Sequence, residues 1–413
     1  MFKALPAVLI LALTVSACDS LLGSKQDDTT DEIFDAARTD PTLFREVEYV
    51  PLFPFFTIGG DGQPLEAPSD VYIGFDQFIY VTDSRGLHVL DRSGRPASFV
   101  SIPGGATSVI QDRTFRVYAT ARRDTTIGER TWNLPVVLRY DGLTTGSADI
   151  GQIIWHPFSD DSRTLNRPDP VSTDEEVEFT GVAVLADGNI LVSRRGPVNP
   201  VASIINPHNA VMEFNENGLN VQTIRSLSPV TPSLRSAVNP SDILTFVHPP
   251  QRQSFSTSRD FIVAQQPPEG EQLQYAVVSI RAVETPEGIE YRTDTDKIQV
   301  AGNPDAGESF LYDDFRFERP TDLAFAADGS NYIFVVDGGK DSLFVFTSRG
   351  VEGVSPPPGA ASSLPVNVSF GGTGDASMEF DNPEGVAYFR RIVYVADTGN
   401  NRISRFRLNT DFE

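Results

Sequence analysis

The segment Asn382-Pro-Glu-Gly-Val-Ala-Tyr-Phe-Arg-Arg-Ile-Val-Tyr-Val-Ala-Asp-Thr-Gly-Asn-Asn-Arg-Ile-Ser-Arg-Phe406 contains one complete β unit. A proline opens a short apolar strand, a second strand ends on Asp397, and a third strand alternates polar and apolar residues. Proline is tolerated at the start of a strand because its missing N–H is not needed there. Only 14 residues separate Pro383 from Asp397, which leaves room for two strands and a tight turn but not for a helix.

The same order of features recurs earlier in the chain. Asp83 follows Pro68 by 15 residues, and Asp337 follows Pro320 by 17 residues. Weaker copies complete a set of six units that start near residues 68, 106, 179, 239, 319 and 382. Such repetition indicates a β-propeller, and starts separated by more than about 40 to 50 residues indicate blades with long loops. Seven or eight blades stay open if an insertion hides a further unit.

The chain resembles the NHL-repeat six-bladed β-propellers. The last unit matches the family pattern in its lead-in Phe370-Gly-Gly-Thr-Gly374 and in the three motifs Pro383-Glu-Gly-Val-Ala387, Val393-Tyr-Val-Ala-Asp397 and Asn400-Asn-Arg-Ile403. A second lead-in, Ile58-Gly-Gly-Asp-Gly62, precedes the first unit. The resemblance covers most of residues 49–413 and implies an all-β, six-bladed propeller. Blades two to four follow from strand alternation alone, because they lack the Asp-Thr-Gly-Asn loop.

The two ends of the repeat region are expected to complete each other. The last unit has three strands where the others have four, and the strand-like segment 49–58 precedes the first unit without a unit of its own. An unpaired edge strand promotes aggregation, and a closed ring removes most such edges. We therefore predict that residues near 49–58 form the outer strand of the last blade.

The amino terminus predicts export and a lipid anchor. Lys3 precedes an apolar stretch that is too short to span a membrane, and Val15-Ser-Ala-Cys18 resembles a bacterial lipobox. The resemblance implies removal of residues 1–17 and lipidation of Cys18, with the membrane as a partner. Residues 18–48 are acidic and polar, as in a flexible tether, and residues 49–413 form the propeller. The expected location is the bacterial cell envelope, with its periplasmic and cell-surface faces both open. An ordinary secretory signal is the alternative.

The net charge of −23 and the isoelectric point near 4.5 argue against nucleic acid as a partner. Binding to phosphates requires clustered lysine and arginine.

Two rings of side chains are expected where the first strand of each blade lines the central channel. The first ring contains Ser69, Thr107, Thr180, Ser241, Thr321 and Glu384. The second ring contains Asp70, Ser108, Gly181, Asp242, Asp322 and Gly385. Asp70, Asp242, Asp322 and Glu384 are hard oxygen ligands that suit Ca²⁺ or Mg²⁺, so they form the candidate metal site, and no other cofactor is expected. The alternative is that each aspartate caps its own turn.

The histidines argue against a zinc site. Some NHL-propeller relatives are metal-dependent lyases, and others resemble calcium-dependent lactonases. The four histidines are at positions 88, 156, 208 and 248 and share no position in the repeat, and we expect the last three to be solvated loop residues. The aspartates that end the second strands recur in three blades, which favours a structural role in the following turn. A divalent-metal-dependent hydrolase or lyase is therefore the second hypothesis.

The first hypothesis is a binding or scaffold module for a protein, peptide or glycan, because a rigid ring presents several loops together. The longest intervals between expected strands are 143–178, 247–259, 283–319 and 350–365. Trp155, Phe158, Tyr312 and Phe315 are aromatic residues of the kind that anchor interfaces. The alternative is that they cover the edges of blades.

Overall fold

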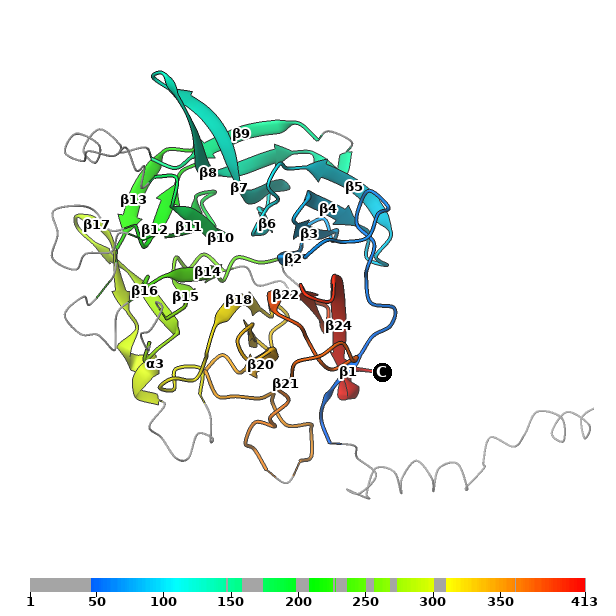
Figure 1. Cartoon of the computed structure of the whole chain (residues 1–413). Helices are drawn as coiled ribbons and strands as arrows, with labels where there is room; N and C mark the ends of the chain where they lie inside the picture. Colours follow the sequence, from blue (N-terminus) through cyan, green and yellow to red (C-terminus); the bar gives the residue numbers. More distant parts are fainter. Residues whose placement is uncertain are drawn as a thin grey trace, which may run out of the picture. The chain divides into compact units, whose positions relative to one another are not determined.

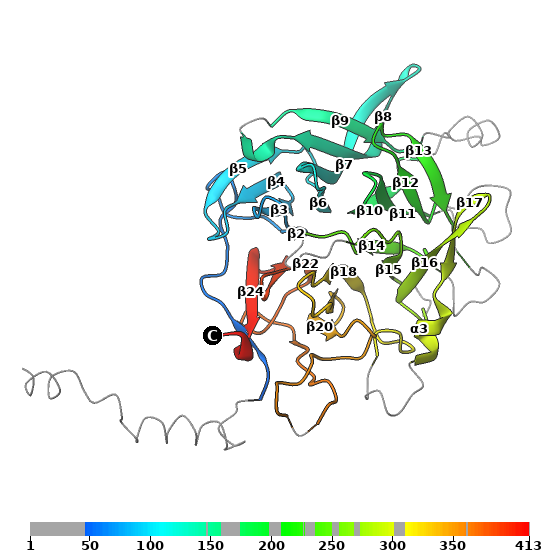
Figure 2. The same cartoon turned by 180° about the vertical axis from the view of Figure 1, so that it is seen from behind.

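Six four-stranded antiparallel sheets surround a central axis in the computed structural model, each forming one blade of a propeller (Figure 1, and from behind in Figure 2). The structure describes residues 46–145, 148–157, 174–197, 208–225, 227, 236–249, 256–267, 273–300, 310–360 and 362–412. Cys18 and the expected signal and tether therefore lie outside the described residues.

Each blade is numbered by its position along the chain, with its innermost strand first. Blade 1 contains β2 (Asp70–Ile73), β3 (Ile79–Asp83), β4 (Gly86–Leu90) and β5 (Pro96–Ser101). Blade 2 contains β6 (Val109–Gln111), β7 (Arg116–Ile127), β8 (Arg130–Asp141) and β9 (Ile150–Trp155). Blade 3 contains β10 (Glu178–Val184), β11 (Ile190–Arg195), β12 (Ala210–Phe214) and β13 (Asn220–Ile224). Blade 4 contains β14 (Pro240–Thr245), β15 (Phe261–Gln265), β16 (Val277–Thr285) and β17 (Gly288–Thr293). Blade 5 contains β18 (Pro320–Phe325), β19 (Ile333–Asp337), β20 (Ser342–Phe346) and β21 (Phe370–Gly371). Blade 6 contains β22 (Pro383–Phe389), β23 (Ile392–Asp397), β24 (Arg402–Leu408) and β1 (Tyr49–Pro51).

The ring closes as the sequence predicts. β1 pairs antiparallel with β24, with Tyr49 opposite Leu408 and Pro51 opposite Phe406. Phe56 forms a further bridge to Ile403. The six predicted starts all coincide with innermost strands, so the number of blades is six. In Figure 1 the amino-terminal strand lies beside the carboxy-terminal strands of the same blade.

Two predicted loop intervals contain strands. The interval 143–178 contains β9 (Ile150–Trp155), the outer strand of blade 2. The interval 283–319 contains the end of β16, strand β17 and the short helix α3 (Thr295–Val300), so the expectation of a loop there was wrong for its first part. The sequence signal failed because Gly288–Thr293 is an outer strand with mixed burial and no clean alternation. Strands β7 and β8 form a hairpin that extends beyond the rest of blade 2 (Figure 1). None of the helices in the described residues is long and apolar enough to cross a membrane.

The core lies between neighbouring blades. β2 and β14 are buried along their whole length because each innermost strand is covered on both faces. One cluster joins Tyr80 of blade 1, Tyr140 of blade 2 and Phe214 of blade 3. Burial of large apolar side chains from adjacent sheets is the main favourable term in folding. This packing holds the inner strands and the channel in place.

Candidate functional site

Hydroxyl groups link neighbouring blades at one mouth of the channel. We call Ser69, Thr107, Thr180, Ser241, Thr321 and Glu384 the mouth ring. Each hydroxyl of this ring donates to a backbone carbonyl oxygen of the next blade: Ser69 to Ala106 (2.7 Å), Thr107 to Phe179 (3.2 Å), Thr180 to Pro240 (3.0 Å), Ser241 to Pro320 (2.7 Å) and Thr321 to Pro383 (3.0 Å). Five of the six blade junctions are therefore joined by the same bond.

Glu384 takes the place of the sixth hydroxyl. The junction between blades 6 and 1 is instead made by Thr398, whose hydroxyl donates to the carbonyl oxygen of Pro68 at 2.7 Å. The Glu384 carboxylate accepts a hydrogen bond of 3.0 Å from the Asn382 side-chain amide. Blade 6 therefore places a carboxylate at the mouth without losing the bond between blades.

The second set of side chains lies one residue deeper along each innermost strand. We call Asp70, Ser108, Gly181, Asp242, Asp322 and Gly385 the aspartate ring. Its polar members accept backbone N–H groups of the next blade, namely Asp70 from Val109 (2.7 Å), Ser108 from Val182 (3.3 Å), Asp242 from Leu323 (3.2 Å) and Asp322 from Val386. Asp70 also accepts the N–H of Val71. The aspartates therefore cap the neighbouring blade more than their own turn.

The two glycines of the aspartate ring occupy places with no room for a side chain. A Cβ atom at Gly385 would lie 2.6 Å from Cα of Asp70, and one at Gly181 would lie 2.5 Å from Oδ1 of Asp242. Both contacts are with the first strand of the next blade. The glycines thus allow two pairs of blades to approach each other closely.

Burial sets the charge of the aspartate ring. It raises the pKa of Asp70 to about 7 and, with repulsion from Asp242 and Asp70, raises the pKa of Asp322 well above its ordinary value. Burial also raises the pKa of Asp242 to about 6. The Asp242 and Asp322 carboxyl groups are close enough to interact through a side-chain hydrogen bond, and such a bond between two carboxyl groups requires a proton on one of them.

The four predicted metal ligands do not form one compact site. Asp70, Asp242 and Asp322 belong to the aspartate ring, and Glu384 belongs to the mouth ring. Within the described residues, no group of three or more His, Cys, Asp or Glu side chains is arranged to hold a metal ion. The aspartates use their oxygens for backbone N–H groups, so a cation would have to compete with these bonds.

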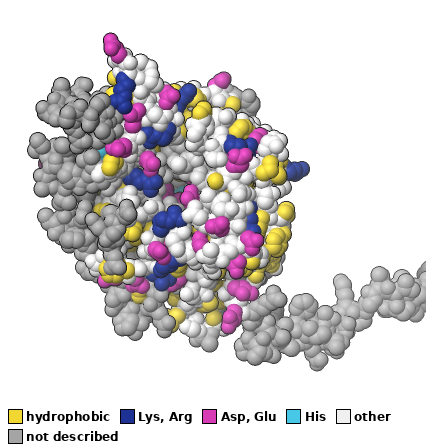
Figure 3. Space-filling view, viewed as in Figure 1, with side chains coloured by type: hydrophobic (Ala, Val, Ile, Leu, Met, Phe, Trp, Pro, Cys, Tyr) yellow, Lys and Arg dark blue, Asp and Glu magenta, His cyan; other side chains and the backbone are white. Residues whose placement is uncertain are grey.

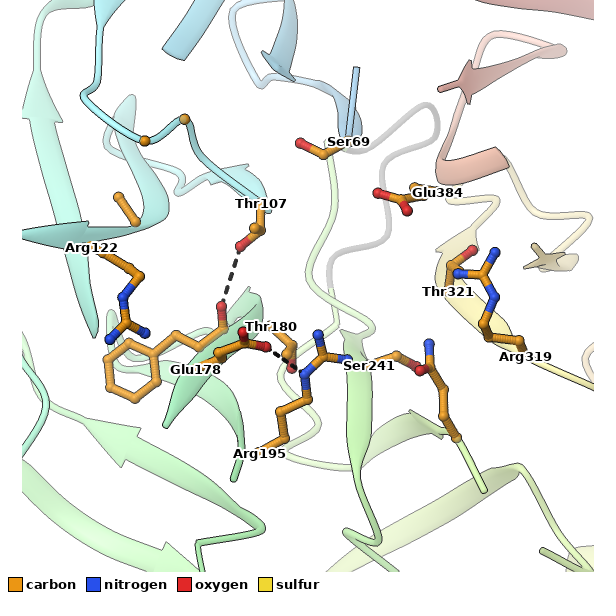
Figure 4. Close-up of a pocket in the computed structure, with 15 residues that line it drawn as sticks. Ser69, Thr107, Arg122, Glu178, Thr180, Arg195, Ser241, Arg319, Thr321 and Glu384 are labelled. Atoms are coloured by element: carbon orange, nitrogen blue, oxygen red, sulfur yellow. Dashed lines mark hydrogen bonds and ion pairs between the residues drawn. The ribbon is translucent and has the colours of Figure 1, made fainter. Parts of the chain in front are cut away.

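A cavity of about 350 Å³ opens above the mouth ring (Figure 4). The ring hydroxyls form part of its wall. Longer polar side chains reach into it from blades 2 to 5, namely Arg122, Glu178, Arg195, Gln266 and Arg319. In Figure 4 the side chains of Arg122, Glu178, Arg195, Arg319 and Glu384 approach the cavity from several blades.

Three of the long side chains occupy the same position in the repeat. Register places Arg122, Arg195 and Gln266 directly after the residue equivalent to Asp83 in blades 2, 3 and 4. The equivalent residues in the other blades are the shorter Ser84, Gly338 and Thr398. Sequence reasoning missed this set, and the signal was the absence of the Asp-Thr-Gly-Asn loop in those blades.

The three arginines of the cavity have different partners. Arg122 donates to the carbonyl oxygens of Val177 and Asn133, both at 2.7 Å, and burial lowers its pKa. Arg195 donates through Nε to the Glu178 carboxylate at 2.7 Å. Arg319 donates to the side-chain oxygen of Asn382. The cavity wall therefore contains three guanidinium groups. One is bound by backbone carbonyl oxygens, one by a carboxylate and one by a side-chain amide oxygen.

The recurring aspartates are structural, as predicted. Asp83 accepts the N–H groups of Arg85 (2.8 Å) and Gly86 (3.0 Å) in the following turn. Asp337 does the same for Gly339 at 2.9 Å. In blade 4, Gln265 stands at this position and accepts the N–H of Val238 at 2.9 Å.

The histidines are more buried than the sequence suggested. His88 is buried between Asp83, 2.9 Å from its Nε2, and the N–H of Gly60, which donates to its Nδ1. The expectation of solvated loop residues was wrong for His156 and His208, which are both buried, and His156 lies 3.1 Å from the guanidinium of Arg194. In blade 3, Arg194 stands at the position of the recurring aspartate. Its side chain contacts both histidines, since its Nε donates to the backbone carbonyl oxygen of His208 and its terminal nitrogen lies beside the His156 ring.

The four predicted aromatic anchors have separate environments. Phe315 is 55% exposed and Trp155 is half-buried against the core of blades 1 to 3. Tyr312 is buried in the cluster between blades 4 and 5, so its ring covers a blade edge. Phe158 lies outside the described residues. The structure brings none of the three described aromatics into the wall of the mouth cavity.

Comparison with known proteins supports the fold. The NHL repeat family matches residues 380–406, and no curated protein matches the chain in sequence. A protein of unknown function from Bacteroides thetaiotaomicron superposes with a TM-score of 0.51 at 12% identity, over 88% of this chain and 77% of that one. An auxiliary nutrient binding protein from the same organism gives 0.49 at 10% identity, over 90% and 78% of the two chains. A gluconolactonase from Xanthomonas campestris gives 0.43 at 11% identity, over 88% and 89%. The chain is a six-bladed β-propeller that carries an NHL repeat in its last blade.

Proposed function

We propose that this protein is a binding module that holds a polar ligand, a glycan or a peptide, in the cavity above the mouth ring. The observation that carries the proposal is the convergence of long polar side chains from blades 2 to 5 on a cavity of about 350 Å³. A cavity of this volume is at the small end of the usual range for ligand sites. In the space-filling view, Lys and Arg side chains lie around the central depression together with Asp and Glu side chains (Figure 3).

The bonds between blades suit a binding site. The mouth-ring hydroxyls are oriented by carbonyl oxygens of the next blade, so their positions are set before a ligand arrives. A site that is ordered in advance loses less conformational entropy on binding. The propeller therefore supplies a rigid floor, and the arginines and Gln266 supply the specific contacts.

Binding can be located with one variant and one control. Glycan and peptide arrays probed with the labelled protein would provide ligands, and calorimetry would then compare the wild type with Gln266→Ala and Gln222→Ala. Gln266 lines the cavity, whereas Gln222 lies on the outer strand β13. Weaker binding in Gln266→Ala alone supports the proposal. Absence of any array ligand, or equal binding by both variants, contradicts it.

The second candidate is a divalent-metal-dependent hydrolase or lyase. One observation favours it: Glu384 is a carboxylate at the mouth that the bond between blades does not need, because Thr398 makes that bond. Metal analysis by mass spectrometry, followed by lactone hydrolysis with and without chelator, tests this candidate. Stoichiometric metal that is lost together with activity would favour it over a pure binding module.

We further propose that the protein is anchored in the bacterial cell envelope through lipidated Cys18. The proposal rests on the Val15-Ser-Ala-Cys18 sequence and on the acidic stretch that follows it. Membrane fractionation of the full chain and of Cys18→Ser tests it. A variant that still sediments with membranes would contradict lipid anchoring.

A further inference from the structure

The mouth cavity has the opposite charge balance to the chain as a whole. The formal net charge of the protein is −23. The residues that line the cavity include three arginines, Arg122, Arg195 and Arg319, and two glutamates, Glu178 and Glu384, which gives a balance of +1. A local excess of positive charge inside a strongly acidic protein attracts an anion to this place and not to the rest of the surface.

Two of the arginines have hydrogen-bond donors that remain for a ligand. Within the described residues, Arg195 uses only Nε, for Glu178, so its two terminal nitrogens contact no protein acceptor. The Arg319 guanidinium contacts the Asn382 amide oxygen and forms no ion pair with any described carboxylate. Both guanidinium groups end at the cavity in Figure 4. A guanidinium with spare N–H groups can bind a carboxylate through two parallel hydrogen bonds.

Arg122 strengthens the field without being available itself. Carbonyl oxygens of Asn133, Glu175 and Val177 occupy its donors and fix its position in the wall. Partial burial lowers the pKa of Arg122, although the charges of Glu178 and Glu175 act in the opposite direction. A bound anion would compensate the charge of Arg122, so Arg122 favours an anionic ligand over a neutral one.

The mouth ring determines what the rest of the ligand must offer. Ser241 and Thr321 donate their hydroxyl hydrogens to Pro320 and Pro383, so toward the cavity these oxygens can only accept. The matching groups on a ligand are hydroxyl donors. The wall thus combines acceptors for hydroxyl groups with guanidinium donors for a carboxylate.

We infer that the ligand at this site is a uronic-acid sugar, whose carboxylate is bound by Arg195 and Arg319 and whose hydroxyl groups donate to the mouth ring. The inference rests on the proposed binding function and specifies its ligand class. A peptide with acidic side chains supplies the carboxylate but lacks the adjacent hydroxyl groups. A neutral sugar supplies the hydroxyl groups but leaves the positive charge uncompensated.

The test uses the full chain and pairs of matched probes. Trisaccharides of galacturonate, glucuronate and mannuronate are titrated by calorimetry, each beside its methyl ester, which has the same shape without the charge. We expect at least one acid to bind about tenfold or more tightly than its ester, and Arg195→Gln and Arg319→Gln each to remove about tenfold of that affinity, as for the loss of a charge-assisted hydrogen bond. Arg292→Gln is the control, because Arg292 is exposed on the outer strand β17.

The outcomes separate this inference from the binding function itself. If an ester binds as tightly as its acid and Gln266→Ala weakens both, the binding site stands and the uronic-acid inference is overturned. If an acid binds but the two arginine variants bind it like the wild type, the inference is also overturned. If neither acids nor esters bind, the uronic-acid class is excluded, and the array experiment decides the binding function. Rescue of affinity in Arg195→Lys would indicate charge alone rather than a paired hydrogen bond.

Discussion

The Thr398 hydroxyl donates a hydrogen bond of 2.7 Å to the carbonyl oxygen of Pro68, residues that are 330 positions apart in the chain. This bond joins the last blade to the first and completes the series that the mouth-ring hydroxyls make at the other five junctions. Thr398 follows the second strand of blade 6, whereas the other five donors lie in or just before an innermost strand. The junction between blades 6 and 1 thus has the same type of hydrogen bond as the other five, but its donor is Thr398 and not the mouth-ring residue. The mouth-ring position of blade 6 is occupied by Glu384.

The closing bond can be tested by moving the donor back. Thr398→Val keeps the shape of the side chain and removes the hydroxyl, so we expect it to lower the free energy of unfolding by about 0.5 to 1.5 kcal/mol. Glu384→Thr places a hydroxyl at the position that serves the other five junctions, and it should restore stability when combined with Thr398→Val. Thermal unfolding of the two single variants and the double variant measures this coupling. Additive losses would show that the two positions do not share the Pro68 carbonyl.

Closure by the amino-terminal segment predicts an asymmetric response of two nearby phenylalanines. Phe56 is buried, bridges to Ile403 and lies under the Arg405 guanidinium, 4.1 Å from the ring centre. Phe56→Ala should therefore cost about 3 to 5 kcal/mol of stability, as for other buried aromatic side chains. Phe53 is 68% exposed, so Phe53→Ala should cost much less. Chemical unfolding of both variants checks this, and equal losses would argue against a sealed last blade.

The aspartate ring predicts a dependence of stability on pH. Asp322 ionises near 3.8 when unfolded, and its pKa is raised in the folded protein, so the folded state keeps a proton that the unfolded chain loses. Stability from this group is full below pH 3.8 and falls as the pH rises toward the folded pKa. Asp322→Asn should keep the bond from Val386 and remove this loss, so its stability relative to the wild type should increase as the pH rises above 3.8.

Other ionisable groups near the ring make a control necessary. Asp70 and Asp242 titrate in the same window, with pKa values raised to about 7 and about 6, and His248 nearby has its pKa lowered to about 4 by burial. The comparison is therefore made between variants at each pH. The exposed Asp375 provides the control Asp375→Asn, whose difference from the wild type should stay constant with pH. A constant difference for Asp322→Asn as well would contradict the prediction.

Close approach of blades 6 and 1 predicts a steric penalty at Gly385. An added Cβ would lie 2.6 Å from Cα of Asp70, and this backbone cannot move without shifting the first strand of blade 1. Gly385→Ala should therefore cost about 1 to 3 kcal/mol, as for other overpacked cores. Ser108→Ala, at the equivalent place in blade 2, creates no new atom and loses the 3.3 Å bond from Val182 and the hydrogen bond to the Asp70 carboxyl group. Thermal unfolding should place Gly385→Ala below Ser108→Ala, and the reverse order would contradict the steric argument.

Much of the channel could be predicted from sequence because it repeats. Alignment of the first strands of the six units placed the members of the mouth ring together, including Glu384 in place of a hydroxyl residue. The partners of these residues could not be predicted, since Asp70 bonds to Val109 and Ser69 bonds to Ala106, each in the next blade. Arg122 and Arg195 were missed because they stand in blades that depart from the repeat. A repeat pattern predicts only the residues that recur, so it does not predict the role of residues at positions where a blade departs from the pattern.

The succession of short strands, prolines and aspartates was sufficient to identify six repeat units and to predict closure by residues near 49–58, because strand pairing in a propeller is local and recurs in each unit. The contents of the mouth cavity depended on the ring as a whole. Arg195 and Arg319 are 124 positions apart and line one cavity because the ring brings blades 3 and 5, on either side of blade 4, to the same mouth of the channel. The closure of the ring brings residues that are distant in sequence to one cavity. A local sequence pattern cannot predict this proximity, because it depends on the arrangement of all six blades.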